Sequence, residues 1–411
     1  MKRTAFLTWF TVGHLANDWP IASLWLVVPT VGLAMGLSPT EVGLLFTIVN
    51  IGGALGYLPA GILTDYASNR GRLLLVTFWW VAVGYALAAM ARGYWDLAIL
   101  LAVAGMGNAA WHPIAAGVLA HESKDGRAQA LGVHAIGGSV AEVLAPLSAG
   151  ILFLYFDWRA ALAISALPTL VLGVCFLPVA RAIPRVERKG IRQQDILDFL
   201  NTWRQGNGLR VVLMICLYNM ASMALLGMIP FYLVAAHSFT AAAAGFTFSA
   251  LLVVGALAQP WAGKVSDTVG RRPVLIVGNL TAGLASAALV FQPSLWIMLA
   301  AMAVAVAALD SIRAAVLAAA IDVTGRREGT TVGLAFVLMD GIGALGSVLA
   351  GIAAAFSWLH MFGLAALFSL GATALTFVIA FRRPEQDSSA HADYLSHRLP
   401  AATGLGSVTD R

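Results

Sequence analysis

The sequence is dominated by a series of twelve apolar segments, each long enough to cross a lipid bilayer as a helix. A membrane-spanning helix needs about 20 consecutive, mainly apolar residues. Because 60% of the 411 residues are hydrophobic and only 11% are charged, little of the chain remains for a soluble domain. The sequence therefore predicts an all-α membrane protein with twelve transmembrane helices, at residues 5–33, 39–64, 71–91, 95–119, 129–153, 158–180, 211–236, 240–264, 272–291, 294–320, 329–355 and 358–381.

One stretch of the sequence occurs twice. The motif that begins at Gly53 and ends at Arg72 recurs 202 positions further along, from Gly255. In each copy an apolar helix ends at an aspartate, and two arginines follow. Because the copies lie after spans two and eight, the repeat is six spans long and keeps its orientation. We therefore predict two six-helix halves with pseudo-twofold symmetry about an axis along the membrane normal.

The repeat divides the chain into four parts. We expect an N-terminal six-helix half at residues 1–180 and a C-terminal six-helix half at 211–382. The polar and basic connection 181–210 is expected to be a cytoplasmic linker with an amphipathic helix on the inner leaflet. The polar tail 383–411 is expected to be disordered in the cytoplasm.

Basic residues are distributed unevenly between the two ends of the spans. Of the 25 lysines and arginines, all except Arg92, Arg159 and Arg313 fall in the termini or in the connections that follow even-numbered spans. The positive-inside rule then predicts a multi-pass protein of the cell inner (plasma) membrane with both termini in the cytoplasm. Since topology explains the net charge of +5, we expect a lipid bilayer as the partner of this surface and no nucleic acid. We also expect a monomer.

Each copy of the repeated motif places one acid and two arginines at the cytoplasmic end of a helix. The carboxylate is poorly placed against the negative end of the helix dipole, and the arginines can neutralise it. Such a cluster can hold two helices in one conformation and release them in another; the alternative is a purely structural turn. The predicted conformational latch comprises Gly61, Asp65, Arg70 and Arg72 in the first copy and Gly263, Asp267, Arg271 and Arg272 in the second.

These features together resemble a known family. A Gly-x-x-x-Asp pattern followed by a glycine and two basic residues, after spans two and eight, is similar to the signature of the major facilitator superfamily. The twelve spans and the duplication match that superfamily over nearly the whole chain. The resemblance implies a secondary transporter whose halves rock around a central site. A finer resemblance, at residues 13–18 of span one and at Trp111-His112-Pro113 of span four, is to fosmidomycin-resistance-type exporters.

Polar side chains also lie deep inside the predicted spans. A charged group near the bilayer centre costs roughly 2.5–3.5 kcal/mol on insertion scales, so it should face a cavity or a partner. Asp310 and Arg313, three residues apart, can pair with each other, which leaves Asp18, Glu142 and Asp340 without a fixed cation. The candidates for proton coupling or substrate binding are His14, Asn17, Asp18, Asn108, Trp111, His112, Glu142, Asp310, Arg313 and Asp340.

Asp18 is the preferred proton carrier because His14 lies one helical turn before it. Burial disfavours the charged form of an acid or a base, whereas an acid beside a histidine favours the charged pair. One or more of Asp18, Glu142 and Asp340 is therefore expected to exchange protons, with His14 and His112 as partners.

Three further residue assignments accompany this hypothesis. His134 lies nearer the cytoplasmic end of its span and is expected to be structural, whereas Trp111 is expected to form a cavity wall. The rival use of the same side chains is a transition-metal site made by His14, Asp18, His112 and Glu142. No local metal-ligand spacing supports it, so we predict no metal and no cofactor.

The sequence favours transport over catalysis. It contains no Gly-x-x-x-x-Gly-Lys-Ser/Thr loop for ATP and no zinc-protease helix, so we expect no enzyme activity and no direct ATP drive. The leading prediction is proton-coupled export of a small molecule, either drug-like or an anionic metabolite. The alternatives are proton-linked uptake of a nutrient such as an organic acid or sugar, and a non-transporting membrane sensor or scaffold.

Overall fold

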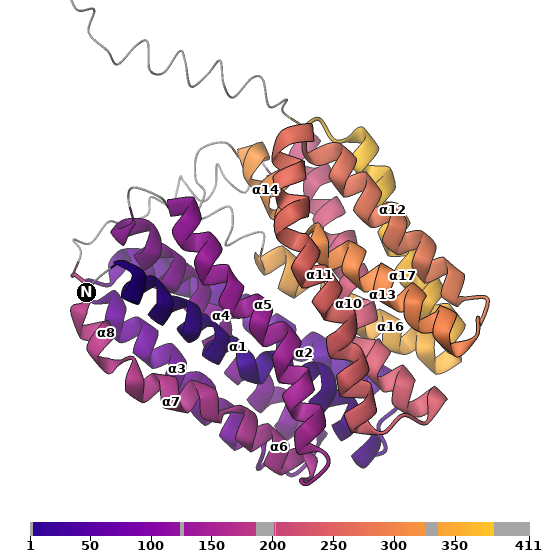
Figure 1. Ribbon diagram of the computed structural model, residues 1–411, viewed down its shortest axis with the longest axis horizontal. Helices are drawn as coiled ribbons and strands as arrows, with labels where there is room; N and C mark the ends of the chain where they lie inside the picture. Colours follow the sequence, from indigo (N-terminus) through magenta and orange to yellow (C-terminus); the bar gives the residue numbers. More distant parts are fainter. Residues whose placement is uncertain (1–2, 124–126, 186–200, 202, 325–335, 382–411) are drawn as a thin grey trace, which may run out of the picture.

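The computed structural model describes residues 3–123, 127–185, 201, 203–324 and 336–381. In this part of the chain the regular structure is entirely helical. The helices form two bundles side by side, an N-terminal half drawn in indigo to magenta and a C-terminal half drawn in red to yellow (Figure 1). The expected amphipathic helix and the tail 383–411 fall mostly or wholly outside the described residues, and their conformations stay predictions.

The N-terminal half contains the first six spans. They are formed by α1 (Arg3–Ala34), α2 (Pro39–Tyr66), α3 (Arg70–Ala88), α4 (Tyr94–Glu122), α5 (Arg127–Leu152), and the consecutive short helices α6 (Trp158–Ser165), α7 (Leu167–Cys175) and α8 (Leu177–Ala182). α2 begins with a capping box, because the Ser38 hydroxyl accepts from the Glu41 N–H while the Glu41 carboxylate accepts from the Ser38 N–H. Span six is interrupted where Pro168 and Pro178 begin new helices, since proline cannot donate a helical hydrogen bond.

The C-terminal half contains the other six spans. They are formed by α10 (Gly206–His237), α11 (Ala241–Val269), α12 (Arg271–Leu289), the pair α13 (Leu295–Ser311) and α14 (Arg313–Thr324), the pair η1 (Val337–Ile342) and α16 (Leu345–Phe356), and α17 (Trp358–Val378). Span ten is interrupted at Ile312, which has φ −90° and ψ 0°. Span eleven contains a π-helical turn, in which the Gly343 N–H donates to the Leu338 carbonyl five residues earlier.

The prediction of twelve spans in two halves is confirmed. Eleven helices or helix pairs of the described chain are long and apolar enough to cross a membrane. The twelfth is α1, whose 32 residues are ample in length, but whose polar residues His14, Asn17 and Asp18 lower its hydropathy. The same residues that weaken the membrane signal of α1 therefore form the polar site described below.

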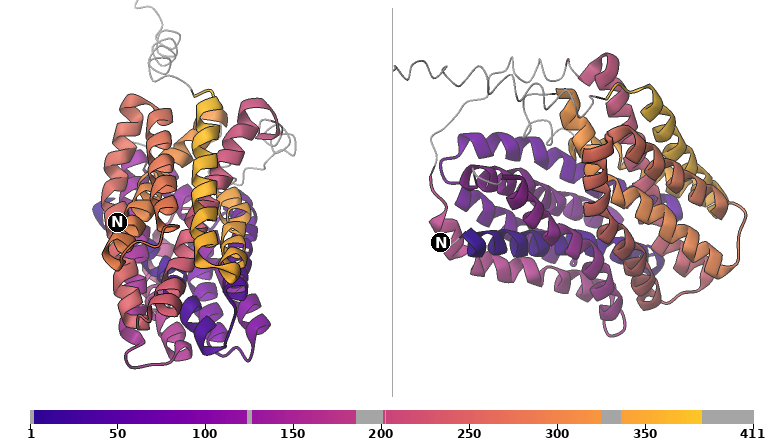
Figure 2. Two further views of the ribbon diagram at one scale, coloured as in Figure 1. Left: turned by 90° about the vertical axis from the view of Figure 1, so that its right-hand side faces the viewer. Right: turned by 45° about the horizontal axis from the view of Figure 1, so that its top comes forward.

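The two halves meet mainly where α2 packs on α16 and η1 and where α5 packs on α11, with a smaller contact between α1 and α10. The approach is closest near the start of α2, where a Cβ added to Gly43 would collide with the backbone of Ser347. Nearby, the Thr47 hydroxyl donates to the Ala344 carbonyl at 2.8 Å. These contacts lie at the end of the bundle that carries the α1–α2 and α10–α11 connections, and the ribbons diverge toward the opposite end (Figures 1 and 2).

Candidate functional site

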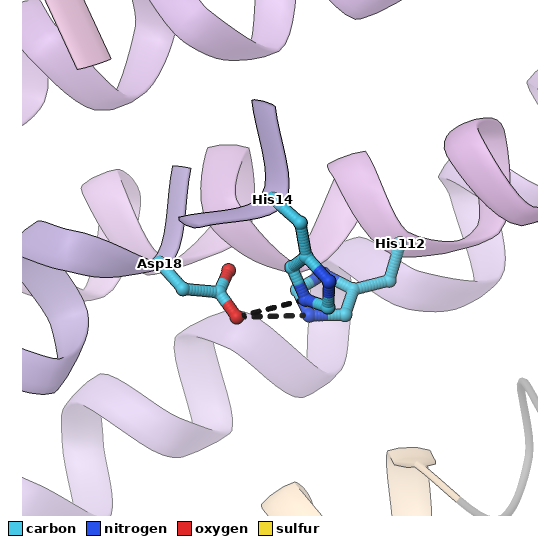
Figure 3. A group of neighbouring side chains, drawn as sticks. All are labelled: His14, Asp18 and His112. Carbon is cyan, nitrogen blue, oxygen red and sulfur yellow. Dashed lines mark ion pairs between the residues drawn. The ribbon is translucent and has the colours of Figure 1, made fainter. Parts of the chain in front are cut away.

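A carboxylate held by two imidazoles lies inside the N-terminal half. His14 and Asp18 lie one turn apart on α1, and His112 reaches them from α4 (Figure 3). Both imidazoles direct Nε2 at the same atom, Asp18 Oδ2, from 3.0 Å for His14 and 3.6 Å for His112. The structure thus brings together three of the predicted site residues, which we call the Asp18 cluster.

Two asparagines hold the other carboxylate oxygen and align the two helices. Asp18 Oδ1 accepts from Asn108 Nδ2 at 2.9 Å and from Asn17 Nδ2 at 3.3 Å. The two amides also reach across the helix pair, since Asn17 donates to the Asn108 carbonyl and Asn108 donates to the Asn17 carbonyl. Because these reciprocal bonds fix α1 against α4, both predicted asparagines position Asp18.

Hydrogen bonding determines where a proton can reside in this cluster. His14 Nδ1 lies 2.9 Å from the His134 carbonyl, and a carbonyl only accepts, so Nδ1 must carry a hydrogen. A neutral His14 would then present a lone pair from Nε2 to a carboxylate oxygen 3.0 Å away. This short contact is a hydrogen bond only if one additional proton lies on His14 Nε2 or on Asp18 Oδ2.

The same logic applies more loosely to His112, whose Nδ1 lies 3.2 Å from the Asn108 carbonyl. Its side chain is 20% exposed against 10% for His14. His112 is therefore the imidazole of the cluster that is more accessible to water.

His134 and Gly138 on α5 support the cluster from behind. The His134 ring stacks on His14 with centroids 4.3 Å apart, and its Nδ1 donates to the Phe10 carbonyl. A Cβ at Gly138 would lie 2.8 Å from the His14 ring and 3.3 Å from Asp18 Oδ2. The contacts of His134 agree with its expected structural role, but the support that its own carbonyl gives to His14 carries no signal in the sequence.

Asp340 meets a partner from the opposite half. The Tyr57 hydroxyl on α2 donates to Asp340 Oδ2 in η1 at 2.6 Å. The Tyr57 ring also packs edge-on against His112, with centroids 6.0 Å apart. Tyr57 was missed by the sequence argument, although it lies within the repeated motif between Gly53 and Gly61. It connects the surroundings of the Asp18 cluster to the C-terminal half.

Glu142 and Arg313 form an ion pair between the halves. Arg313 Nη1 on α14 donates to Glu142 Oε1 on α5 at 2.6 Å. The expected pair between Asp310 and Arg313 is therefore wrong, and so is the expectation that Glu142 has no fixed cation. The physical reason is the break at Ile312, because residues three apart face each other only along a continuous helix.

A central cavity contains the remaining predicted charges. About 480 Å³ of space lies between its walls, a figure that includes solvent at its open side. Glu142, Asp310 and Arg313 line it, whereas no residue of the Asp18 cluster does. The other lining residues are Trp25, Tyr218, Asn219, Ser222, Met223, Leu225, Leu226, Val306 and Leu309.

Trp111 does not line this cavity. It is completely buried in the core of the N-terminal half, where its ring packs on Phe78 and Phe10. The expected cavity wall is instead supplied in part by Trp25 of α1. Adjacent positions on a helix face directions about 100° apart, so Trp111 points into the core while His112 reaches the Asp18 cluster.

The predicted latch is described only in its second copy. Arg271 pairs with Asp267 and also reaches Asp322 on α14 at 3.3 Å, while Arg272 donates to the Ile379 carbonyl at 2.6 Å. These contacts tie the α11–α12 turn to other helices of the same half. In the first copy Arg70 donates to the Thr64 carbonyl, and the side chain of Asp65 lies outside the described residues. Any latching role stays a prediction.

The metal alternative can be tested against distances. The ligand atoms of His14, Asp18 and His112 lie within 4.8 Å of one another, but Glu142 pairs with Arg313 instead. Ligands of a tetrahedral ion with bonds of about 2.0–2.1 Å lie roughly 3.3 Å apart. The 3.0 Å separation of His14 Nε2 from Asp18 Oδ2 is shorter and matches a hydrogen bond. The 3.6 Å separation of His112 Nε2 from the same oxygen is longer than the metal spacing, and the expectation of no metal stays a prediction.

Two helical halves that enclose a polar cavity define a multi-pass membrane transporter. A family model described as the Major Facilitator Superfamily matches residues 10–253 and 211–408. The chain belongs to the major facilitator superfamily. The finer resemblance of spans one and four to fosmidomycin-resistance-type exporters is not tested by this match and stays a prediction.

Similar proteins are named as transporters of several compounds. The chain is 25% identical over 285 residues to a putative metabolite transport protein of Haemophilus influenzae, covering 66% of this chain and 69% of the relative. It is 30% identical to a probable 4-methylmuconolactone transporter of Cupriavidus pinatubonensis over 35% of each chain. It is also 35% identical to a probable sugar efflux transporter of Pasteurella multocida over 33% of each chain.

Solved structures show the same fold. A bacterial homologue of the human lysosomal transporter Spinster superposes with a TM-score of 0.76 at 18% identity, covering 98% of this chain and 100% of that one. A nucleoside transporter superposes with a TM-score of 0.73 at 11% identity, covering 92% and 99%.

Proposed function

We propose that this protein is a secondary transporter that couples protons to the export of a small molecule by alternating access. The observation that carries the proposal is the contact between His14 Nε2 and Asp18 Oδ2, which is a hydrogen bond only with one additional proton. An ionisable residue within a membrane span is a candidate functional residue by default, and proton relays are among the roles of such residues. The Asp18 cluster is the proposed proton carrier, and the central cavity is the proposed substrate site.

The surroundings of the cluster support reversible protonation. Asp18 Oδ1 is occupied by amide donors from Asn17 and Asn108, so a proton on the acid would reside on Oδ2. That atom faces both imidazoles. His112, as the more exposed of the two, is the proposed entry point for protons from water. Tyr57 contacts both His112 and Asp340, so it is the proposed link by which protonation of the Asp18 cluster would affect Asp340 in the other half.

The contacts between the halves fit an alternating-access cycle. If the positive-inside orientation holds, the end closed by Gly43 and Ser347 faces outside and the diverging end faces the cytoplasm. The cavity residues come from both halves, so rocking of one half against the other would expose them to either side. The same cycle runs in both directions, and the gradients determine the net flow.

The test is transport by the purified protein in proteoliposomes. A thermal-shift screen identifies a ligand, and counterflow of that ligand is then measured with and without an imposed pH gradient. We expect the gradient to accelerate transport by the wild type and to have no effect on Asp18→Asn, which keeps the shape but cannot exchange a proton. His360→Gln is the matched control, since His360 lies in a helix cap outside the cluster.

The outcome separates the alternatives that the sequence left open. A wild-type protein whose transport ignores the pH gradient, or an Asp18→Asn variant with full coupling, would contradict the proposal. Uptake in right-side-out vesicles with an inward proton gradient would establish the import alternative. A protein that binds ligand but shows no counterflow under any gradient would be the sensor or scaffold.

A further inference from the structure

The guanidinium of Arg313 in the central cavity has N–H donors without a hydrogen-bond partner in the described part of the chain. Arg313 uses Nη1 to bind Glu142, and in the described part of the chain this is its single hydrogen bond. An arginine has five N–H donors in a planar fork, so most of this fork remains available. The side chain is 35% exposed and lines the cavity. A guanidinium in this state can bind a second planar oxyanion.

The pair with Glu142 is a weak form of an arginine–carboxylate contact. It has one hydrogen bond, whereas the strongest pairs have two parallel ones. It also joins two helices that belong to different halves, α5 and α14, so it must break or rotate when the halves move. A carboxylate that moves freely in the cavity can bind both edges of the fork and is not restrained by the backbone of α5.

Charge balance indicates that Glu142 and such an anion exclude each other. With Glu142 bound, Arg313 is already neutralised, and Asp310 adds a further acid to the cavity wall. Asp310 lies against the backbone of α11, because a Cβ at Gly255 would be 2.6 Å from its Oδ2. A second anion bound while Glu142 stays on Arg313 would therefore bring three carboxylates around one guanidinium, which is costly in a medium of low dielectric constant. When the anion binds, the released Glu142 carboxylate must turn to the open side of the cavity, where its side chain is already 32% exposed.

The rest of the wall is suited to an apolar body. Trp25 from α1, with Leu226 and Val306 from the opposite half, presents apolar surface around the charged groups. Tyr218 and Asn219 already donate to backbone carbonyls, of Leu309 and Met339 respectively. Among the lining residues, Arg313 is the one cation available to orient an anionic ligand.

We propose that the transported molecule is a monocarboxylate with an apolar or aromatic body, and that its carboxylate replaces Glu142 on Arg313. This inference rests on the proposed transport function and specifies the chemistry of its substrate. Binding breaks the Glu142–Arg313 contact and thereby removes one of the bonds that hold the halves together. Arg313 is thus both the substrate anchor and the point at which substrate binding acts on the arrangement of the halves.

The test compares two probes of the same size and shape, benzoate and benzamide, which differ in charge. Their affinities are measured on the purified full-length protein by thermal shift and calorimetry. We expect benzoate to bind and benzamide not to bind. Arg313→Gln should weaken benzoate binding by about tenfold or more, whereas Glu142→Gln should strengthen it by about threefold or more, because the competing carboxylate is gone.

The matched control variants each remove one charge from a residue that does not line the cavity. Arg159→Gln changes an arginine that donates to the Ala91 carbonyl outside the cavity, and Glu122→Gln changes an acid that pairs with His121. Neither should alter benzoate binding. If Arg313→Gln fails to fold, the gain in affinity of Glu142→Gln tests the competition alone.

Three results would overturn the inference. The first is the absence of benzoate binding to both the wild type and Glu142→Gln. The second is benzoate binding that is unaffected by Arg313→Gln. The third is preferential binding of the cationic probe benzylamine, lost in Asp310→Asn. Each can occur while transport remains coupled to the pH gradient through Asp18, so failure of this inference is distinguishable from failure of the proposed function.

Discussion

Replacing Gly138 by alanine provides a direct test of the Asp18 cluster, because the substitution adds a single methyl group beside it. The new Cβ would lie 2.8 Å from the His14 ring, and ordinary contacts begin at 3.4 Å. The ring must therefore move by about 0.6 Å. Because the new Cβ lies 2.8 Å from His14 Nε2 and 3.3 Å from Asp18 Oδ2, this move is oblique to the contact and lengthens it from 3.0 Å to about 3.3 Å, which weakens the hydrogen bond. Overpacking of this kind costs about 1–3 kcal/mol.

Gly132→Ala on the same helix is the matched control, since a Cβ there meets nothing within 4 Å. Both substitutions gain helix propensity, by up to about 1 kcal/mol, so their difference isolates the contact with His14. We expect Gly132→Ala to raise the unfolding temperature and Gly138→Ala to lower it, and only Gly138→Ala to weaken the response of transport to a pH gradient. Equal unfolding temperatures and equal pH responses of the two variants would refute the argument.

Three further variants test other contacts. Asn108→Ala removes the donors to Asp18 and to α1 and should lower the free energy of unfolding by about 1–3 kcal/mol; thermal unfolding in detergent measures this, and wild-type stability would show that the amides are dispensable. Tyr57→Phe keeps the ring but removes the hydroxyl that binds Asp340, so we expect normal folding with a changed pH profile of transport, and an unchanged profile would count against a link between the halves. Asp322→Asn should lower the free energy of unfolding by about 1 kcal/mol or less, because Arg271 keeps its pair with Asp267. Arg271→Gln removes both pairs and should cost more; equal losses of the two variants in thermal unfolding would contradict this.

The sequence predicts the architecture well because membrane helices have a strong one-dimensional signal. Length and hydropathy locate the spans. The motif that begins at Gly53 and recurs from Gly255 predicts the two halves. The Asp18 cluster was also predictable in part. His14 and Asp18 share one helix face by their spacing alone, and His112 had to face a cavity or a partner because of its depth in the bilayer.

Contacts between helices were harder to infer. The pairing of Arg313 with Glu142 depends on the break at Ile312 and on the distance between α5 and α14, and neither is encoded in local spacing. Trp111 illustrates the same limit, because no pattern in the sequence says which face of α4 meets the core. The role of the His134 carbonyl is invisible in principle, since every residue has a carbonyl and only the fold selects one.

The closure between α2 and α16 is made by backbone against backbone, where Gly43 meets Ser347. Backbone atoms at such a contact cannot rotate out of the way as a side chain can. Passage at that end therefore requires the two bundles to tilt as solid bodies, and the slow step of any turnover should be a collective rotation rather than a rotamer change. A larger side chain at the contact between α2 and α16 would then shift the equilibrium between the inward-open and outward-open arrangements of the halves instead of blocking a pore.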